Sequence, residues 1–232
     1  MKRICKNILP LILILFATLS CDDMMDVHEK YIKGGEIIYA PKIDSMIFYP
    51  GKDRVLFQFW LKNAPNAKSV DVLWNNKQDS LIIPVTPSIG LDSMALYISG
   101  LEEKSYTFEV RVSDMYGHKS LYSTGYASAY GSIFQSILNP RNVRNVLYNS
   151  LGGSIYWFGA PVNLIATEIR YTNVDGDIKV IRTPETESMT SCPDAKPNTA
   201  FEYRSLFVPE ANAVDTFYLD WVSGLSFPDY NP

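Results

Sequence analysis

The chain of 232 residues contains few side chains that could perform catalysis or bind a metal ion. It has three cysteines (Cys5, Cys21 and Cys192) and two histidines (His28 and His118). A disulfide scaffold, a zinc site with several cysteine or histidine ligands and a redox pair all need more of these residues. Aromatic side chains are the remaining candidates for ligand contact, because Phe, Trp and Tyr make up 13% of the chain and four of them are tryptophans.

A serine nucleophile would need one of the two histidines as its base. We expect His28 to lie in a tether before the fold and His118 to lie in a turn, so neither is placed as a base. The Gly-x-Gly-x-x-Gly, phosphate-loop and Gly-x-Ser-x-Gly patterns are absent from the sequence. We therefore predict no enzymatic activity and no cofactor, and an enzyme with an unrecognised site is the least favoured alternative.

One stretch resembles a calcium loop, because oxygen-bearing side chains alternate in Asn173-x-Asp175-Gly176-Asp177. It lacks the distant bidentate Glu of an EF-hand. The Asp-Gly pair lies between two stretches of alternating hydrophobicity, which is typical of a hairpin turn. We therefore interpret the stretch as a turn and predict no metal site.

The alternation of residue types in 54–61 predicts a β-strand with one buried face. The inward residues are Val55, Phe57 and Phe59. The outward face carries Leu56, Gln58 and Trp60. Trp60 is therefore the first candidate for contact with a ligand or partner, although it could equally pack between modules or against a partner protein.

The pattern predicts different positions for the other three tryptophans. Trp74 and Trp157 fall on inward positions of predicted strands, where a core tryptophan is expected. Trp221 lies near the C-terminus after an aromatic run, and the pattern leaves its facing open. Trp221 is therefore the second candidate contact residue.

Short runs rich in Val, Ile, Tyr and Phe begin near Ile37 and are separated by Gly, Pro, Asn and Asp. This pattern is typical of an all-β protein. After removal of residues 1–20 and a tether, the remaining chain has the length of two sandwiches of about 100 residues each. We predict two tandem immunoglobulin/fibronectin type III-like β-sandwiches at 36–130 and 131–232.

The stretch 98–112 resembles the corner of a fibronectin type III domain. In that corner a leucine, here Leu101, closes the end of the sandwich, and a tyrosine, here Tyr106, starts the next strand and bonds back to the backbone. The stretch 195–201 is a weaker match in the second half, with Phe201 in the place of the tyrosine. Phe201 has no hydroxyl, so we expect that hydrogen bond to be missing there.

The first 20 residues have the layout of a signal peptide, with a basic start and an apolar run over 8–19. This run is too short for a transmembrane helix, which needs roughly 20 residues. Thr18-Leu19-Ser20-Cys21 resembles a bacterial lipobox, which implies lipid attachment at Cys21. The alternative is a conventional signal peptide that leaves Cys21 as a free thiol, a liability in an oxidising compartment.

An acidic cluster formed by Asp22, Asp23 and Asp26 follows Cys21, and residues 21–35 as a whole are expected to form a tether. The cluster resembles the surface-export signal of Bacteroidetes lipoproteins, which implies a lipid-anchored protein on the outer face of the outer membrane. A solvated acidic tether is the other interpretation, and the two are compatible.

The chain as a whole resembles a Bacteroidetes lipoprotein family known only as the domain of unknown function four-nine-nine-eight. The matching stretches are 35–39, 49–55, 74–76, 79–80, 106–109, 117–120, 130–131, 201–205 and 215–218. The resemblance implies location and architecture but no activity. Lipoproteins of this kind accompany outer-membrane glycan-uptake machinery, so it also points towards carbohydrate handling.

Charge argues against a nucleic-acid partner. The full chain has a net charge of −4, and loss of Lys2, Arg3 and Lys6 with the signal leaves 18 basic against 25 acidic residues, or −7. No basic stripe is left to neutralise phosphates. We expect a non-catalytic module that binds glycans or assists glycan-uptake proteins, with a structural or protein-interaction module as the alternative.

Overall fold

The computed structural model describes residues 38–87 and 89–230, and residues from Ala40 onward form one compact unit. Cys21 and the acidic residues Asp22, Asp23 and Asp26 lie outside the described residues, as does His28. Among the described residues, no helix has the length and hydrophobicity needed to cross a bilayer.

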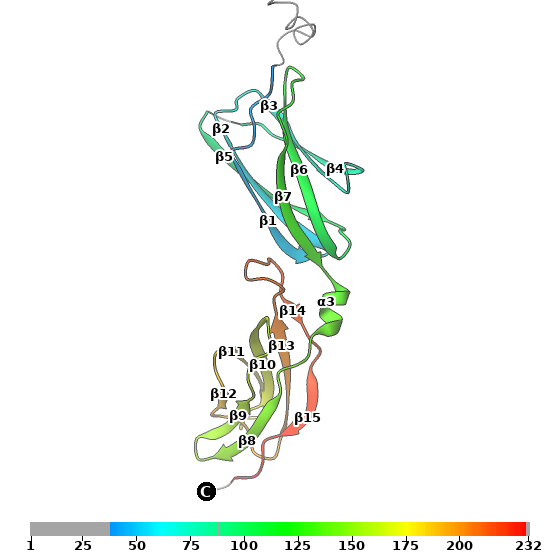
Figure 1. Ribbon diagram of the computed structural model, residues 1–232. Coiled ribbons are helices and arrows are strands. Elements are labelled where there is room, and N and C mark those ends of the chain that lie inside the picture. Colours follow the sequence, from blue (N-terminus) through cyan, green and yellow to red (C-terminus); the bar gives the residue numbers. More distant parts are fainter. Residues whose placement is uncertain (1–37, 88, 231–232) are drawn as a thin grey trace, which may run out of the picture. The chain divides into compact units, whose positions relative to one another are not determined.

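The first half of the unit consists of seven strands in two layers (Figure 1). One layer has the order β1-β2-β5, and the other has the order β4-β3-β6-β7. A short parallel pairing of β1 with β7, between Gly51–Lys52 and Ala129–Tyr130, connects the layers. The strands are β1 (Ser45–Lys52), β2 (Arg54–Lys62), β3 (Ala67–Trp74), β4 (Asp79–Pro84), β5 (Leu91–Ser99), β6 (Lys104–Asp114) and β7 (Ser123–Tyr130).

Apolar side chains from both layers form the core of this first sandwich. Phe48 of β1 stacks on Phe57 of β2 at 4.5 Å between ring centroids and on Phe108 of β6 at 4.4 Å. The alternation that the sequence predicted for 54–61 is confirmed, because its inward side chains are at most 2% exposed. The inward residues predicted for β6 are buried as well, and they are Tyr106, Phe108, Val110 and Val112.

The second half also consists of strands in two layers, β8 to β15 (Figure 1). One layer has the order β12-β9-β8, and the other has the order β11-β10-β13 with β14 and β15 paired to β13. The strands are β8 (Val143–Asn149), β9 (Gly152–Trp157), β10 (Leu164–Thr172), β11 (Ile178–Pro184), β12 (Met189–Cys192), β13 (Ala200–Phe207), β14 (Phe217–Tyr218) and β15 (Val222–Ser226).

The core of the second sandwich is built around Trp157, Phe201 and Phe227, all at most 3% exposed. Trp157 is inward, as the alternation predicted, and its indole N–H donates to Thr190 Oγ1 at 2.9 Å. The predicted turn at Asp175-Gly176 is present between β10 and β11, with Gly176 at φ +92. The all-β architecture of two tandem sandwiches is therefore confirmed, while the boundary at Gly131 stays a prediction.

A six-residue helix, α3 (Ser132–Ile137), follows β7, and the sequence pattern did not predict it. Its N-cap residue, Gly131, offers no side chain to the first backbone N–H groups. The carboxylate of Glu103 accepts these bonds instead, from Ile133 N at 2.7 Å and Phe134 N at 2.6 Å. A negative charge at a helix N-terminus also opposes the helix dipole, so the cap stabilises a helix too short to form alone.

Candidate functional site

Trp60 lies on the outer face of the layer β1-β2-β5 and is half-buried. Its register partners are Ser45 on β1 and Ser93 on β5. Alternation with the buried Phe59 and Leu61 directs Trp60 away from the core. This is the outward placement that the sequence favoured for the first candidate contact residue.

Several of the side chains around Trp60 are apolar, although this face points away from the core. The next two rows of register partners are Ile47-Gln58-Ala95 and Tyr49-Leu56-Tyr97. Ile47 is 41% exposed and Tyr97 is 45% exposed. We call the surface formed by Ser45, Ile47, Tyr49, Leu56, Gln58, Trp60, Ser93, Ala95 and Tyr97 the Trp60 face.

Arg54, the first residue of β2, lies at one end of the Trp60 face. Its guanidinium carbon lies 4.0 Å from the centroid of the Tyr97 ring, which is within the range of a cation–π contact. The same guanidinium donates from Nε to Asp215 Oδ2 at 2.9 Å and from Nη2 to Asp215 Oδ1 at 2.6 Å. This pairing holds the pKa of Asp215 below its ordinary value, against the opposing effect of burial.

Further contacts join residues of the first half to the loop before β14. Lys52 N donates to Asp215 Oδ2 at 2.8 Å, and Val214 N donates to the carbonyl oxygen of Pro50 at 2.8 Å. A Cβ atom on Gly51 would lie 2.7 Å from Asp215 Oδ2, so any other residue at this position would displace the Asp215 side chain. The pair Arg54–Asp215 is thus one part of a set of contacts between the halves, which we call the junction.

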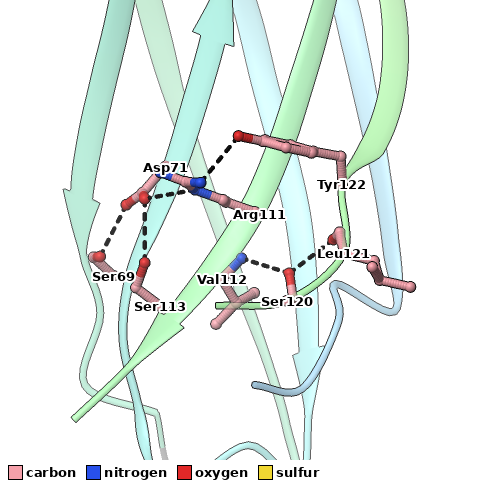
Figure 2. Close-up of polar contacts among 8 residues, drawn as sticks. All are labelled: Ser69, Asp71, Arg111, Val112, Ser113, Ser120, Leu121 and Tyr122. Carbon is pink, nitrogen blue, oxygen red and sulfur yellow. Dashed lines mark hydrogen bonds and ion pairs between the residues drawn. The ribbon is translucent and has the colours of Figure 1, made fainter. Parts of the chain in front are cut away.

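Asp71, on the outer face of β3, is the centre of a polar cluster (Figure 2). It accepts from Ser69 Oγ at 3.0 Å, Ser113 Oγ at 3.1 Å and Arg111 Nε at 3.2 Å. Arg111 Nη1 in turn donates to the hydroxyl of Tyr122 at 3.0 Å. Three side chains of the same sheet donate hydrogen bonds to this carboxylate, so its negative charge is compensated although Asp71 is buried. The two serine hydroxyls are used as donors to Asp71, and we therefore do not assign either of them as an activated nucleophile.

His118 is bound within its own turn. Its Nδ1 lies 2.9 Å from Asp114 Oδ2, and Asp114 Oδ1 accepts the backbone N–H groups of Tyr116 and His118. Burial opposes the charged form of Asp114, but these hydrogen bonds overcome it and lower the pKa of Asp114. The nearby Ser120 hydroxyl accepts from Val112 N and donates to the carbonyl of Leu121 (Figure 2). The arrangement fixes a turn and brings no serine to the imidazole as a nucleophile.

Trp221, the second candidate contact residue, is half-buried beside the layer β10-β13. The guanidinium carbons of Arg170 and Arg204 lie 4.5 Å and 4.6 Å from its ring centroid. Each arginine also forms an ion pair with the residue opposite it on the neighbouring strand, Arg170 with Glu202 and Arg204 with Glu168. These contacts give Trp221 a packing role within its own sandwich.

The three corner residues lie in the interior. Leu101 is 6% exposed and Tyr106 is 5% exposed, and the Tyr106 hydroxyl donates to the carbonyl of Glu102 at 3.1 Å. Phe201 is 1% exposed and packs on Phe227 at 4.9 Å between ring centroids. The aromatic ring at the second corner therefore fills the core where the first corner has a hydrogen bond.

Two features of the candidate sites are not predicted by the sequence pattern, in addition to the helix α3. Trp74, expected in the core, is only half-buried, because it is the last residue of β3 and lines a cavity of about 260 Å³. The pair Arg54–Asp215 joins residues far apart in the chain, and no local signal in the sequence predicts it. Within the described part of the chain, no group of three or more His, Cys, Asp or Glu side chains is placed to hold a metal ion.

The strand order and the corner at Leu101–Tyr106 define a tandem fibronectin type III-like protein. The chain is similar to the FN1–FN3 domains of chicken CNTN1, with 14% identity and a TM-score of 0.46, covering 82% of this chain and 66% of that one. It is also similar to a two-domain fibronectin type III segment of chicken tenascin, with 13% identity and a TM-score of 0.31, covering 80% and 99% of the two chains. No curated protein matches the sequence significantly.

The particular family is given by a sequence match. The family DUF4998, a domain of unknown function, matches residues 21–217. The chain belongs to this family. A domain of unknown function on a fibronectin type III-like fold is consistent with a non-catalytic structural module.

Proposed function

We propose that this protein is a non-catalytic surface lipoprotein that binds glycans through the Trp60 face. Lipid at Cys21 anchors it to the outer membrane with the two sandwiches facing the cell exterior, where it assists glycan-uptake proteins. The observation that carries the proposal is the half-exposed Trp60 with Ser45 and Ser93 opposite it and Gln58 in the next row. The lipoprotein signal at Thr18–Cys21 supports the location.

The chemistry of the Trp60 face suits a sugar chain. Aromatic rings stack on the C–H faces of sugars, and hydroxyl and amide side chains bond to sugar hydroxyl groups. Trp60 and the row containing Tyr97 are four residues apart along β2, roughly 13 Å at the usual rise per residue. This distance is longer than one sugar ring, so the face would take a chain lying along the strand.

Calorimetry against a panel of polysaccharides tests this function. We expect Trp60→Ala to weaken binding at least tenfold, because it removes the largest stacking surface. Tyr126→Ala is the matched control, since Tyr126 is 72% exposed but lies on β7 in the other layer. Uniform absence of binding, or equal losses in both variants, would contradict the proposal.

The location has a separate test. Mass spectrometry of the protein from its own membrane should show an acylated Cys21, since stable anchoring needs more than one acyl chain. Protease treatment of intact cells should then remove the sandwiches. An unmodified thiol at Cys21, or full protection from the protease, would contradict the anchor or the orientation.

The second candidate function is a structural spacer or protein-interaction module without a small ligand. The junction favours it, because Arg54–Asp215 and the Glu103 cap of α3 both join groups from different halves of the chain. Residual dipolar couplings measured on both sandwiches should fit one alignment tensor in the wild type, and the fit to one tensor should worsen in Asp215→Ala. Two tensors in the wild type would exclude a stiff spacer.

A further inference from the structure

We infer that the cavity beside Trp74, at the end of the first sandwich, binds a single neutral sugar ring. This inference rests on the proposed glycan-binding function and adds a site separate from the Trp60 face. The cavity has a volume of about 260 Å³, and its lining includes Trp74, Asn75, Asp79, Glu102 and Tyr106. Trp74, Asn75 and Asp79 lie at the end of β3, in the β3–β4 turn and at the start of β4, and Glu102 and Tyr106 flank the start of β6.

The indole of Trp74 is held by the core on one side. Val70 and Val72, on the same face of β3, are fully buried, whereas Trp74 at the strand end is only half-buried. Its ring centroid lies 6.1 Å from that of Phe108. A ring already fixed by packing loses little freedom when a ligand stacks on it, so less of the binding free energy is spent on ordering.

The β3–β4 turn fixes one wall of the cavity. Asn75, Asn76 and Lys77 all have positive φ angles, at 50°, 55° and 67°, a conformation that asparagine tolerates but that is costly for a lysine. Asn75 Nδ2 donates to Asp79 Oδ2 at 2.6 Å. This bond uses one amide N–H and one carboxylate oxygen, so the two side chains keep further donor and acceptor capacity that a sugar can use.

The corner at Leu101–Tyr106 supplies further lining of the cavity. The Tyr106 hydroxyl donates to the carbonyl of Glu102, and the side chain of Leu101 is buried. The Glu102 carboxylate is 82% exposed and accepts from Lys104 Nζ at 2.9 Å. The buried residues Leu101 and Tyr106 are therefore in place before a ligand arrives, as expected of a small-molecule site, whereas the Glu102 carboxylate lies at the exposed edge of the cavity.

The chemical class of the ligand follows from these groups. An aromatic ring offers a stacking surface, while a carboxylate and an amide offer paired acceptors and donors for adjacent hydroxyl groups. Asp79 and Glu102 are both negative and Lys104 offsets one of these charges, so the cavity disfavours an anionic ligand. A neutral sugar ring can stack on the aromatic ring and form hydrogen bonds with the carboxylate and amide groups, and it carries no negative charge that the cavity would repel.

The test is a nuclear magnetic resonance titration that follows the four tryptophan indole N–H signals. The protein is the mature chain with Cys21→Ser, and each signal is assigned by a Trp→Phe substitution. Glucose, galactose, mannose and xylose are titrated as monosaccharides and short oligosaccharides, with glucuronate as the anionic comparison. We expect a saturable shift of the Trp74 signal with at least one neutral sugar and none with glucuronate.

Two variants refine the test without removing core side chains. Asp79→Asn should weaken the Trp74 response at least tenfold, whereas the control Asp220→Asn, an exposed carboxylate of the second half, should leave it unchanged. An unchanged unfolding temperature in each variant shows that the protein is folded. An equal response of wild type and Asp79→Asn, or a Trp74 shift of the same size with glucuronate, overturns the inference.

The pattern of shifts separates this inference from the proposed function. If only the Trp60 signal responds, the Trp74 cavity is not a sugar site, while glycan binding through the Trp60 face stands. If only the Trp74 signal responds, the cavity is the site and the Trp60 face is wrong. If no indole responds to any sugar, both ideas fail.

Discussion

Arg54 binds both carboxylate oxygens of Asp215 with one guanidinium group, which also lies 4.0 Å from the centre of the Tyr97 ring. One side chain of β2 therefore joins the Trp60 face to a loop of the second half. Bidentate pairs of this geometry are among the stronger charge-assisted hydrogen bonds in proteins. The interaction gives Arg54 a role in orienting Tyr97 as well as in holding the two halves of the chain together.

Removal of this pair should destabilise the protein. We expect Asp215→Ala to lower the free energy of unfolding by about 1 kcal/mol, less than a buried charged hydrogen bond because solvent screens the partly exposed arginine. Urea unfolding followed by tryptophan fluorescence measures the change. Lys104→Ala, which breaks the exposed pair with Glu102, is the control and should cost less. A larger loss in the control would contradict this assignment.

The stability of the protein should fall in acid, partly through Asp215. Its pKa in the folded protein lies below the ordinary value of 3.8, so the unfolded chain binds more protons in that range. The stabilisation is fully present above the unfolded pKa and is lost as pH falls through the lower folded pKa. Melting temperatures between about pH 6 and pH 2.5 should fall less steeply in Asp215→Asn than in the wild type. Identical slopes would show that Asp215 does not titrate in this way.

A close approach in the second core predicts sensitivity at Gly153. A Cβ atom there would lie 2.4 Å from Cε1 of Phe227, whose side chain is fully buried. Gly153→Ala should therefore cost about 1–3 kcal/mol through overpacking. Gly159→Ala is the matched control, since nothing lies within 4 Å of the position that a Cβ atom would take there. Thermal unfolding compares the two, and a neutral Gly153→Ala would mean that the phenyl ring can move aside.

Cys192 should be chemically inert in the folded protein. Burial, and to a smaller extent the nearby Asp194, raise the pKa of the Cys192 thiol to about 12 from 9.0. The thiolate is the reactive form, so alkylation at pH 8 should be slow. In the mature chain with Cys21→Ser, iodoacetamide labelling followed by mass spectrometry should be rapid only in denaturant. Rapid labelling of the native protein would contradict the burial of Cys192.

Alternation in the sequence predicted which faces of β2, β6 and β9 are buried, because facing is a property of each strand alone. It did not predict that Trp74 would be half-buried, since Trp74 is the last residue of β3 and alternation does not determine which other elements cover the end of a strand. The helix α3 was missed for a similar reason. Its N-terminus is capped by Glu103, a residue about thirty positions earlier in the chain, and the local sequence carries no cap of its own.

For the candidate contact residues too, the sequence predicts what depends on one strand and does not predict contacts between strands. The outward facing of Trp60 follows from its neighbours in β2. The contacts that distinguish Trp60 from Trp221 cannot be predicted from neighbouring residues, because the two arginines beside Trp221 come from β10 and β13. Such pairings depend on strand register across the sheet, which composition and periodicity do not determine.

The Glu103 cap has a consequence for how this architecture can evolve. The carboxylate belongs to the first half, whereas the helix it caps packs through Phe134 on Phe217 of the second half, at 5.0 Å between ring centroids. Replacing either sandwich by an unrelated one would leave a helix without its cap or an aromatic pair without its partner. The two modules are therefore expected to be inherited and exchanged as a pair, unlike modules on a free linker, which recombine one at a time.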